Sequence, residues 1–135
     1  MVQNKKKRRA KYGNKKVKTA DHTYDSKREK LCHDLIKKFK IPHKFQVKYE
    51  LQPGFRNPSG KAIRKIYMVI DFVLVRSDGT MLIVDVKGVV SDMSAMKYKM
   101  LGYRLNNAGH KYEIIFLKSD RAVKDFVLKL HVDGL

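Results

Sequence analysis

The sequence has one cysteine, few acidic residues and no long apolar run. Cys32 stands alone, which excludes an internal disulfide and fits a reducing compartment. With five scattered histidines it gives no zinc-ligand spacing. The longest apolar stretch, 67–75, is interrupted by Asp71 and is far too short to span a membrane. The basic N-terminus has no hydrophobic run behind it, so we expect no secretory signal and a cytoplasmic location.

Acidic residues are outnumbered, with 13 Asp and Glu against 31 Lys and Arg and a net charge of +18. A protein this basic repels itself unless a polyanion takes up the charge, so nucleic acid is the expected partner. An anionic membrane surface is the lesser alternative. The length of 135 residues suits one domain, and 43% apolar residues are enough for a core.

Half of the net charge lies in residues 1–20, which carry nine basic residues and no acid. This segment has almost no apolar content before Val17, so it is predicted to be a flexible basic arm ahead of a folded domain at 21–135. A merely solubilising end is the alternative. The residues of the arm predicted to bind DNA are Lys5, Lys6, Lys7, Arg8, Arg9, Lys11, Lys15 and Lys16.

The remaining pattern predicts an α/β fold. Ser26 and Glu29 form a capping box that opens a helix, which ends before Ile41-Pro42. A further helix is expected from Ser91 or Ser94 to about 106, and a last one from Ser119. Strands are expected at 45–51, 63–76, 81–87 and 112–117. The order α-β-β-β-α-β-α predicts a central mixed sheet flanked by helices.

Two carboxylates interrupt the apolar strands. Asp71 lies within the strand 63–76 and Asp85 within 81–87. An unpaired ionised carboxylate on a buried strand costs several kcal/mol, as an order of magnitude, or its pKa shifts until the group is neutral. A neighbouring group must therefore compensate for the charge. Lys87 follows Asp85 by two residues and therefore shares its face of the strand.

The turn between these strands decides whether the two acids meet. A two-residue loop at 78–79 sets Asp71 against Val86, with the acids on opposite faces. A three-residue loop with Gly79 in the left-handed conformation pairs Arg76 with Thr80. Asp71 then lies opposite Asp85, with Cβ atoms roughly 5 Å apart. We favour the second register as a hypothesis, because it gathers both acids and Lys87 on one face.

Paired carboxylates without nearby His or Cys suit Mg²⁺, for which Mn²⁺ can substitute. Such a cation, with Lys87, can support attack on a phosphodiester. The alternative for Asp71, Asp85 and Lys87 is a buried salt-bridge cluster. The Asp-x-Lys triplet alone has low specificity, since Asp25-Ser26-Lys27 is a second copy at a helix start.

A helix with a Glu, a strand with an Asp and a following Asp-x-Lys strand resemble the PD-(D/E)xK restriction-endonuclease-like nucleases. Within them, the spacing is similar to small Holliday-junction resolvases. Four segments are similar to a phage and prophage family of Gram-positive bacteria: Lys-Tyr-Gly-Asn-Lys-Lys-Val (11–17), Tyr-Asp-Ser-Lys-Arg-Glu (24–29), Glu-Leu-Gln-Pro-Gly-Phe-Arg (50–56) and Asp-Val-Lys-Gly (85–88). In two departures from the pattern, Asp85 replaces the more usual Glu and Ile70 stands where the Pro of the name would be.

The resemblance implies a restriction-endonuclease-like core and a Mg²⁺-dependent DNA endonuclease that leaves 5′-phosphate and 3′-hydroxyl ends. It implies that Asp71 and Asp85 are metal ligands and that Lys87 is catalytic. Glu29 would be a ligand, directly or through water, although the capping box also explains it. Branched DNA, above all a four-way junction, is the implied substrate, and a homodimer suits its two-fold character. A phage-encoded enzyme would act in the bacterial host cytoplasm.

Other residues are weaker candidates. Arg56 at a loop tip and Lys97 and Lys99 on the helix after the motif are predicted DNA contacts, with a loop anchor and a solvated helix face as the alternatives. His33, one turn after Glu29, is expected at the surface. Two other functions remain open. One is a non-catalytic, ribosomal-type nucleic-acid-binding protein, which leaves the buried acids unexplained. The other is a different PD-(D/E)xK nuclease, an exonuclease or a restriction-type enzyme.

Overall fold

The computed structural model describes residues 15–135, in which helices flank a central four-stranded sheet of order β3-β6-β7-β8. The sheet strands are β3 (Lys44–Gln52), β6 (Ile66–Val75), β7 (Met81–Val86) and β8 (Tyr112–Leu117). The helices are α1 (Lys27–Lys38), α2 (Asp92–Asn107) and α3 (Asp120–Asp133). β3, β6 and β7 are antiparallel neighbours and β8 joins β7 in parallel, which confirms the predicted mixed sheet and the order of its elements.

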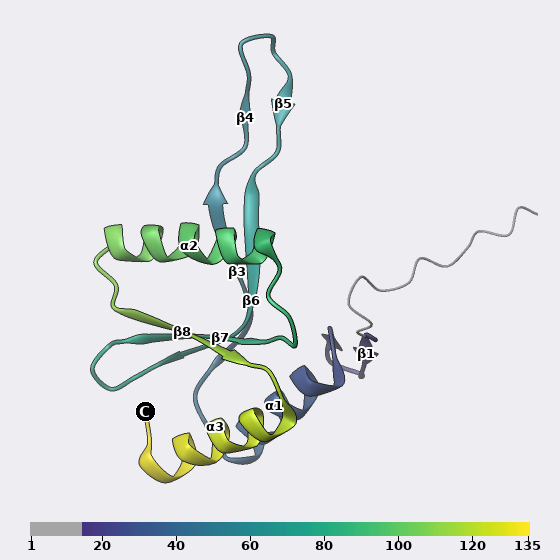
Figure 1. Cartoon of the computed structure of the whole chain (residues 1–135), viewed down its shortest axis with the longest axis vertical. Coiled ribbons are helices and arrows are strands. Elements are labelled where there is room, and N and C mark those ends of the chain that lie inside the picture. The colour runs from purple at the N-terminus through teal and green to yellow at the C-terminus, as the bar shows by residue number, and fades with distance from the viewer. Residues whose placement is uncertain (1–14) are drawn as a thin grey trace, which may run out of the picture.

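The helices lie on opposite sides of the sheet. α1 and α3 lie side by side below it and α2 lies above it in Figure 1. Two apolar clusters follow from this arrangement. One joins Cys32 and Ile36 of α1 and Val123 and Val127 of α3 to the sheet, and the other joins Tyr98, Leu101 and Leu105 of α2 to its other face. Both faces of the central strands are therefore buried, as their nearly continuous apolar sequences require.

Serine side chains begin each helix. The Oγ atoms of Ser26, Ser91 and Ser119 accept hydrogen bonds from backbone N–H groups in the first turns of α1, α2 and α3. Of the two serines expected to cap α2, Ser91 is the one used. None of the helices within residues 15–135 has the length and apolar character needed to cross a membrane.

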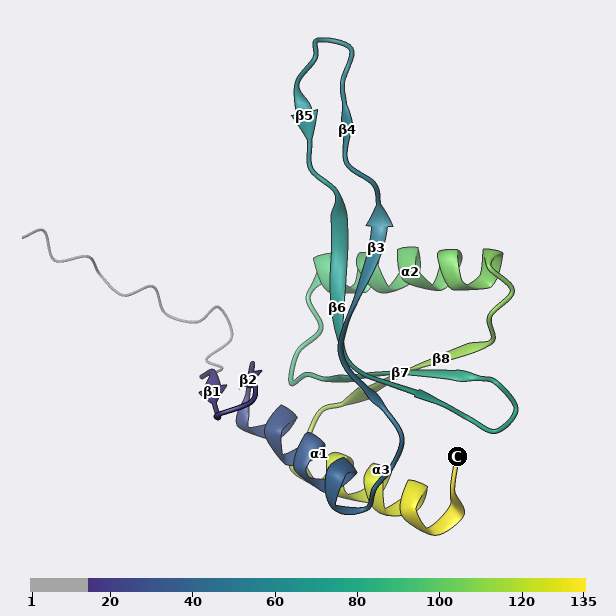
Figure 2. The same ribbon diagram turned by 180° about the vertical axis from the view of Figure 1, so that it is seen from behind.

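Two short hairpins add to the predicted elements. β1 (Val17–Lys18), within the predicted arm, pairs with β2 (Thr23–Tyr24), and β4 (Phe55–Arg56) pairs with β5 (Ala62–Ile63). The single strand predicted at 63–76 is therefore wrong in its first part. The β3–β6 ladder shifts register between Glu50 and Gln52, and Pro53 cannot donate a ladder hydrogen bond. Pairing stops there and resumes in β4–β5, which projects beyond the sheet (Figure 2).

The loop between β6 and β7 has the favoured three-residue form. Arg76 N–H donates to the Thr80 carbonyl at 2.9 Å, and Gly79 has a φ of 89°. The ladder pairs Val75 with Met81 and Phe72 with Val84, so the next opposed residues are Asp71 and Asp85. This confirms the predicted register and brings the two acids together.

Strand β6 changes face at Asp71. Met68 and Ile70 pack with α2, whereas Phe72 and Leu74 pack with α1 and α3. Regular alternation would keep all four on one face. On β3, the ladder sets Gln46 opposite Asp71, and Gln46 has a left-handed φ of 49°. The chain is thus distorted on both strands at the level of the buried acid, where Figure 1 shows β6 bending away from β7.

We expect Gly79→Ala to lower the free energy of unfolding by about 1 kcal/mol, because a Cβ disfavours the left-handed conformation that this turn needs. Urea unfolding followed by circular dichroism measures the change. Gly88→Ala is the matched control, because its Cβ would meet only Arg28 Nη1, at 3.7 Å, and no positive φ applies there. Equal stabilities of the two variants would contradict a turn that depends on glycine.

Candidate functional site

Asp71 and Asp85 lie where the β6–β7 ladder ends, and each carboxylate accepts a backbone hydrogen bond. The N–H of Asp71 donates to Asp85 Oδ1 at 2.9 Å, and the N–H of Val86 donates to Asp71 Oδ2 at 2.8 Å. The two side chains thus satisfy backbone donors that the diverging strands no longer satisfy. Asp71 is 8% exposed and Asp85 1% exposed, so both carboxylates are held away from bulk water.

Helix α1 brings Glu29 to the same place. Its N–H donates to Ser26 Oγ at 3.1 Å, as the capping box predicts. Its Oε2 accepts from the N–H of Asp25 at 2.7 Å and its Oε1 from Gln46 Nε2 at 3.3 Å. Glu29 is 1% exposed, and one of its carboxylate oxygens lies within 4.8 Å of a carboxylate oxygen of Asp71. The backbone N–H of Glu29 therefore takes part in the helix cap, whereas its side chain accepts from Asp25 in place of the N-cap residue Ser26.

Asp25, which sequence reasoning missed, completes the group of acids. Asp25, Glu29 and Asp71 each offer an oxygen, and these atoms lie within 4.8 Å of one another. Oxygen ligands at this spacing suit a hard divalent cation. In the sequence, Asp25 appears only as the first residue of a second Asp-x-Lys triplet at a helix start. The available clue was its position directly before the cap of the helix that carries Glu29.

Lys87 faces the acids without neutralising them. Its Nζ lies 3.8 Å from Asp85 Oδ2 and 3.4 Å from Ser94 Oγ, and 32% of the side chain is exposed. Among residues 15–135, Asp85 Oδ2 has no hydrogen-bond partner. This long ion pair supplies one positive charge, whereas Asp25, Glu29, Asp71 and Asp85 supply four carboxyl groups. The excess of negative charge argues against a self-contained buried salt bridge and fits a bound cation.

Burial sets the protonation of these acids. It is the main cause that raises the pKa of Asp71 to about 9, with the charges of Asp85 and Glu29 adding to it. Burial also raises the pKa of Glu29 and of Asp85, while the N–H of Asp71 and the Lys87 ammonium partly offset the rise at Asp85. Without a cation, each of these three carboxyl groups therefore takes up a proton at a higher pH than an isolated carboxyl group does.

Gln46 is the second residue that sequence reasoning missed. Its Nε2 donates to the Thr23 carbonyl at 2.9 Å as well as to Glu29 Oε1. It joins β3 to β2 and α1 across the site. Its position opposite Asp71 and its left-handed backbone depend on the tertiary arrangement. The amino-acid pattern around Gln46 predicts an ordinary strand and does not indicate that its side chain bonds Thr23 and Glu29.

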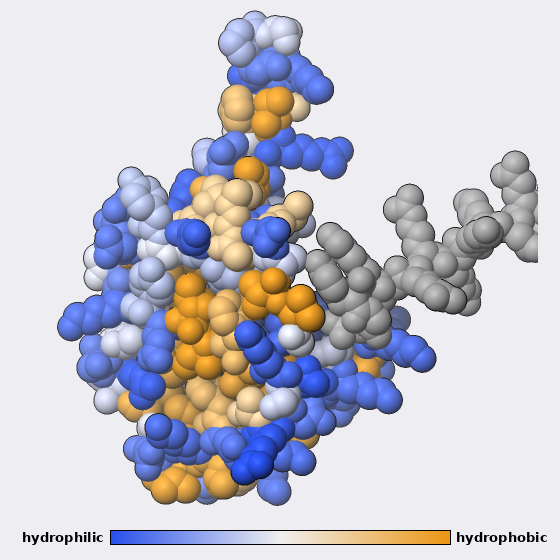
Figure 3. Space-filling view, viewed as in Figure 1, coloured by the Kyte–Doolittle hydropathy of each residue, from blue (hydrophilic) through white to orange (hydrophobic). Residues whose placement is uncertain are grey.

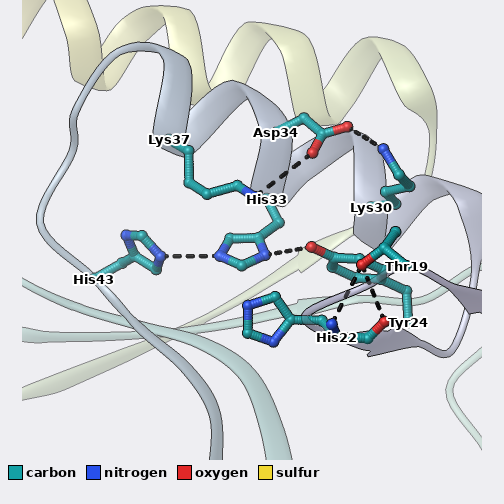
Figure 4. A network of polar contacts seen from close by, with 8 residues as sticks. All are labelled: Thr19, His22, Tyr24, Lys30, His33, Asp34, Lys37 and His43. Atoms are coloured by element: carbon teal, nitrogen blue, oxygen red, sulfur yellow. Dashed lines mark hydrogen bonds and ion pairs between the residues drawn. The ribbon is translucent and has the colours of Figure 1, made fainter.

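An aromatic and histidine cluster fixes the elements that carry the acids (Figure 4). The Tyr24 hydroxyl and His33 Nδ1 are 2.8 Å apart, and His33 Nε2 is 3.2 Å from His43 Nε2. His33 also stacks on Phe45 with ring centroids 4.1 Å apart. The expected surface position of His33 is therefore wrong: it is buried, and burial lowers its pKa to about 4. Tyr24 and Phe45 directly adjoin Asp25 and Gln46, so this cluster positions the site.

A cleft of about 220 Å³ opens onto the acids and is lined by Asp25, Asp71, Lys87 and Ser94. Lys97 lies in an adjoining groove, where its Nζ donates to the Tyr67 carbonyl at 3.1 Å. Lys99 lies elsewhere, in a groove with Tyr103 and Arg104. The two lysines predicted as DNA contacts are therefore separated, and only Lys97 lies beside the cleft.

Of the contacts predicted in the loop and the arm, the structure describes Arg56, Lys15 and Lys16. Arg56 is on the projecting β4–β5 hairpin, where its guanidinium donates to the Gly60 carbonyl at 2.9 Å. Lys15 and Lys16 are exposed. The other predicted residues of the arm lie outside the described part of the chain: Lys5, Lys6, Lys7, Arg8, Arg9 and Lys11.

A family model described as "Protein of unknown function (DUF1064)" matches residues 9–121, so the chain belongs to that family. The match includes the four acids, Gln46 and Lys87. No curated protein and no solved structure matches the chain.

We expect Asp71→Asn to stabilise the metal-free protein at alkaline pH, because it removes repulsion among buried acids. The pKa of Asp71 is raised to about 9 in the folded protein. The stability it contributes is therefore present below its unfolded pKa of about 3.9 and is lost as pH rises through the folded value. In EDTA at pH 8.5, the free energy of unfolding of the variant should exceed that of wild type by at least about 1.4 kcal/mol, the equivalent of one pKa unit.

Urea unfolding at pH 6 and pH 8.5 tests this expectation, and the difference between wild type and variant should shrink at the lower pH. Asp34→Asn, an exposed acid paired with Lys30 and Lys37, should instead be slightly destabilising, by less than about 1 kcal/mol. Equal pH dependence in wild type and Asp71→Asn would show that Asp71 is ionised without cost.

Proposed function

We propose that this member of the DUF1064 family is a Mg²⁺-dependent DNA endonuclease that hydrolyses phosphodiester bonds. The resemblance to the PD-(D/E)xK nucleases supplies the reaction class. The element order and the meeting of Asp71, Asp85, Lys87 and Glu29 are consistent with a restriction-endonuclease-like core. Asp25 is an addition from the structure.

The observation that carries the proposal is the imbalance of charge at the cleft. Asp25, Glu29 and Asp71 bring oxygens within 4.8 Å of one another, and Asp85 accepts the N–H of Asp71 beside them. The partly exposed Lys87 pairs only with Asp85, at 3.8 Å, and Asp85 Oδ2 has no hydrogen-bond partner in the described chain. A structural ion-pair cluster would match its charges, because an uncompensated buried carboxylate destabilises a fold by several kcal/mol, as an order of magnitude. Asp71, Glu29, Asp25 and Asp85 would hold the cation, which Mn²⁺ can replace.

When bound, the cation supplies Lewis acidity and positive charge at a phosphodiester. The other groups belong to the chain. The Lys87 ammonium lies at the cleft and can neutralise charge that builds on the phosphate under attack. Ser94 Oγ, 3.4 Å from Lys87 Nζ, holds the lysine on the side of α2. Asp71 remains oriented by the N–H of Val86, so the acid keeps its direction while substrate enters.

DNA is the proposed substrate because the chain carries a net charge of +18 and the cleft continues into a groove that contains Lys97. Phosphate contacts of this kind give affinity without base sequence. Branched DNA and a homodimer follow from the resemblance to Holliday-junction resolvases, since a four-way junction offers two equivalent strands. Such an enzyme would act in the cytoplasm of a bacterial host.

Cleavage of a labelled four-way junction and a matched linear duplex tests the activity. With Mg²⁺, wild type should make paired cuts in the junction, whereas EDTA or Asp85→Asn should abolish cutting. Lys87→Ala should slow it roughly 100- to 1,000-fold, the usual loss for one charge-stabilising group. Lys124→Ala, an exposed charge on α3, should cut like wild type.

Tight binding of both DNAs without cutting, also with Mn²⁺, would overturn the nuclease and favour a non-catalytic binding protein. Cutting of the linear duplex only from its ends, with closed circular DNA resistant, would indicate an exonuclease. Equal cutting of both DNAs at internal sites would retain the nuclease and remove the preference for branches.

Asp25→Asn should weaken Mn²⁺ binding roughly 10- to 100-fold, the range found when metal-supporting groups are removed. Titration calorimetry on the DNA-free protein measures this affinity independently of cleavage. The backbone N–H of Asp25, which donates to Glu29, and the Ser26 cap of α1 are both unchanged in the variant. Asp34→Asn is the matched control, and equal affinities for both variants would exclude Asp25 as a ligand.

A further inference from the structure

The β4–β5 hairpin projects from the body of the protein and is built as a rigid ribbon. Phe55 pairs with Ile63 and Arg56 with Ala62. Asn57 Oδ1 closes the tip by accepting from Ser59 N–H at 3.1 Å, Ser59 Oγ at 2.8 Å and Lys61 N–H at 2.9 Å. At the base, a Cβ on Gly54 would lie 3.2 Å from the Ile63 carbonyl oxygen, so the two strands approach closely there. Figures 1 and 2 both show the ribbon standing clear of the helices.

The charged residues of this ribbon are all basic. Residues 52–66 contain Arg56, Lys61, Arg64 and Lys65 and no acid, and all four side chains are exposed. Phe55 is 51% exposed and belongs to neither apolar cluster of the described chain. In Figure 3 the ribbon is mainly hydrophilic, with a band of hydrophobic surface below its tip. Residues 53–65 contribute to neither apolar cluster, so the charge and the apolar band of the ribbon point to an external partner.

A groove connects the ribbon to the candidate site. It has a volume of about 600 Å³ and contains Lys65 at the foot of the ribbon, Tyr67, Lys97, Ser94 and Lys87. Lys87 and Ser94 also line the cleft that holds Asp71. Lys48 Nζ lies 4.0 Å from the centre of the Tyr67 ring, adding a further cation beside the path. Positive charge is therefore continuous from the acids to the ribbon.

We propose that the β4–β5 hairpin is a DNA-binding arm that enters the major groove of the duplex next to the cleaved phosphodiester. This inference rests on the proposed function, because it places the scissile strand at Asp71. The major groove of B-form DNA admits a two-stranded ribbon, and the four basic side chains can contact the flanking phosphates. Phe55 supplies apolar contact to base edges. The deep, narrow major groove of an RNA duplex excludes such a ribbon.

Binding of a labelled linear duplex in EDTA tests the arm separately from catalysis, with every protein carrying Asp85→Asn. Fluorescence anisotropy over a series of salt concentrations gives the slope of log affinity against log salt. Adding Arg56→Ala and Lys61→Ala should reduce this slope by about 2, one for each lost phosphate contact. Lys124→Ala with Lys129→Ala removes the same charge from α3 and should leave the slope unchanged.

A second measurement reports on the apolar band. The chain has no tryptophan, so Phe55→Trp places the only tryptophan fluorophore of the protein in the ribbon. DNA duplex should quench or shift its emission, and an RNA duplex of the same sequence should not. Val132→Trp, at a position 73% exposed on α3, should respond to neither.

Equal salt slopes for the ribbon and α3 double variants, or a Phe55→Trp emission that DNA leaves unchanged, would overturn the arm while leaving the nuclease proposal intact. An equal response to RNA and DNA would overturn entry into the major groove.

Discussion

The structure depends on how two buried carboxylates end a β-ladder. Where β6 bends away from β7, Asp71 and Asp85 accept the backbone N–H groups of Val86 and Asp71 that a continuing ladder would otherwise satisfy. The strands can therefore diverge beside the cleft without leaving these two N–H groups unsatisfied. The same arrangement buries Asp71, which raises its pKa, and the repulsion from the nearby charge of Asp85 adds to that rise. The proposed cation would relieve that repulsion.

The elements around the divergence are fixed by residues that directly adjoin the acids. Tyr24, Phe45 and Phe72 pack around His33, and their neighbours along the chain are Asp25, Gln46 and Asp71. A site assembled from β2, α1, β3 and β6 needs such support, because none of these elements holds the group alone. Packing of the His33 cluster and geometry of the acids are therefore coupled, and the buried, neutral imidazole serves the position of the site.

Acids and bases are separated over the surface in a way that suits a phosphate polymer. Negative charge is concentrated at Asp25, Glu29, Asp71 and Asp85, and the groove that leads away from them carries lysines. Under the proposed function, an anionic strand would be attracted along the groove and would meet the acids where the cation bridges them. The β4–β5 ribbon extends this basic path beyond the compact part of the fold.

The sequence by itself determined the elements and half of the site. Serine caps, apolar periodicity and the glycine turn are local, so they predicted the helices, the mixed sheet and the register that sets Asp71 opposite Asp85. Only the tertiary structure decided that Asp25 and Gln46 join them, that His33 is buried, and that residues 62–63 leave β6 to form a ribbon. These features depend on how α1 and β2 dock on the sheet and on where strands lose their partners. Such contacts join residues distant in sequence, and no local period or cap encodes them.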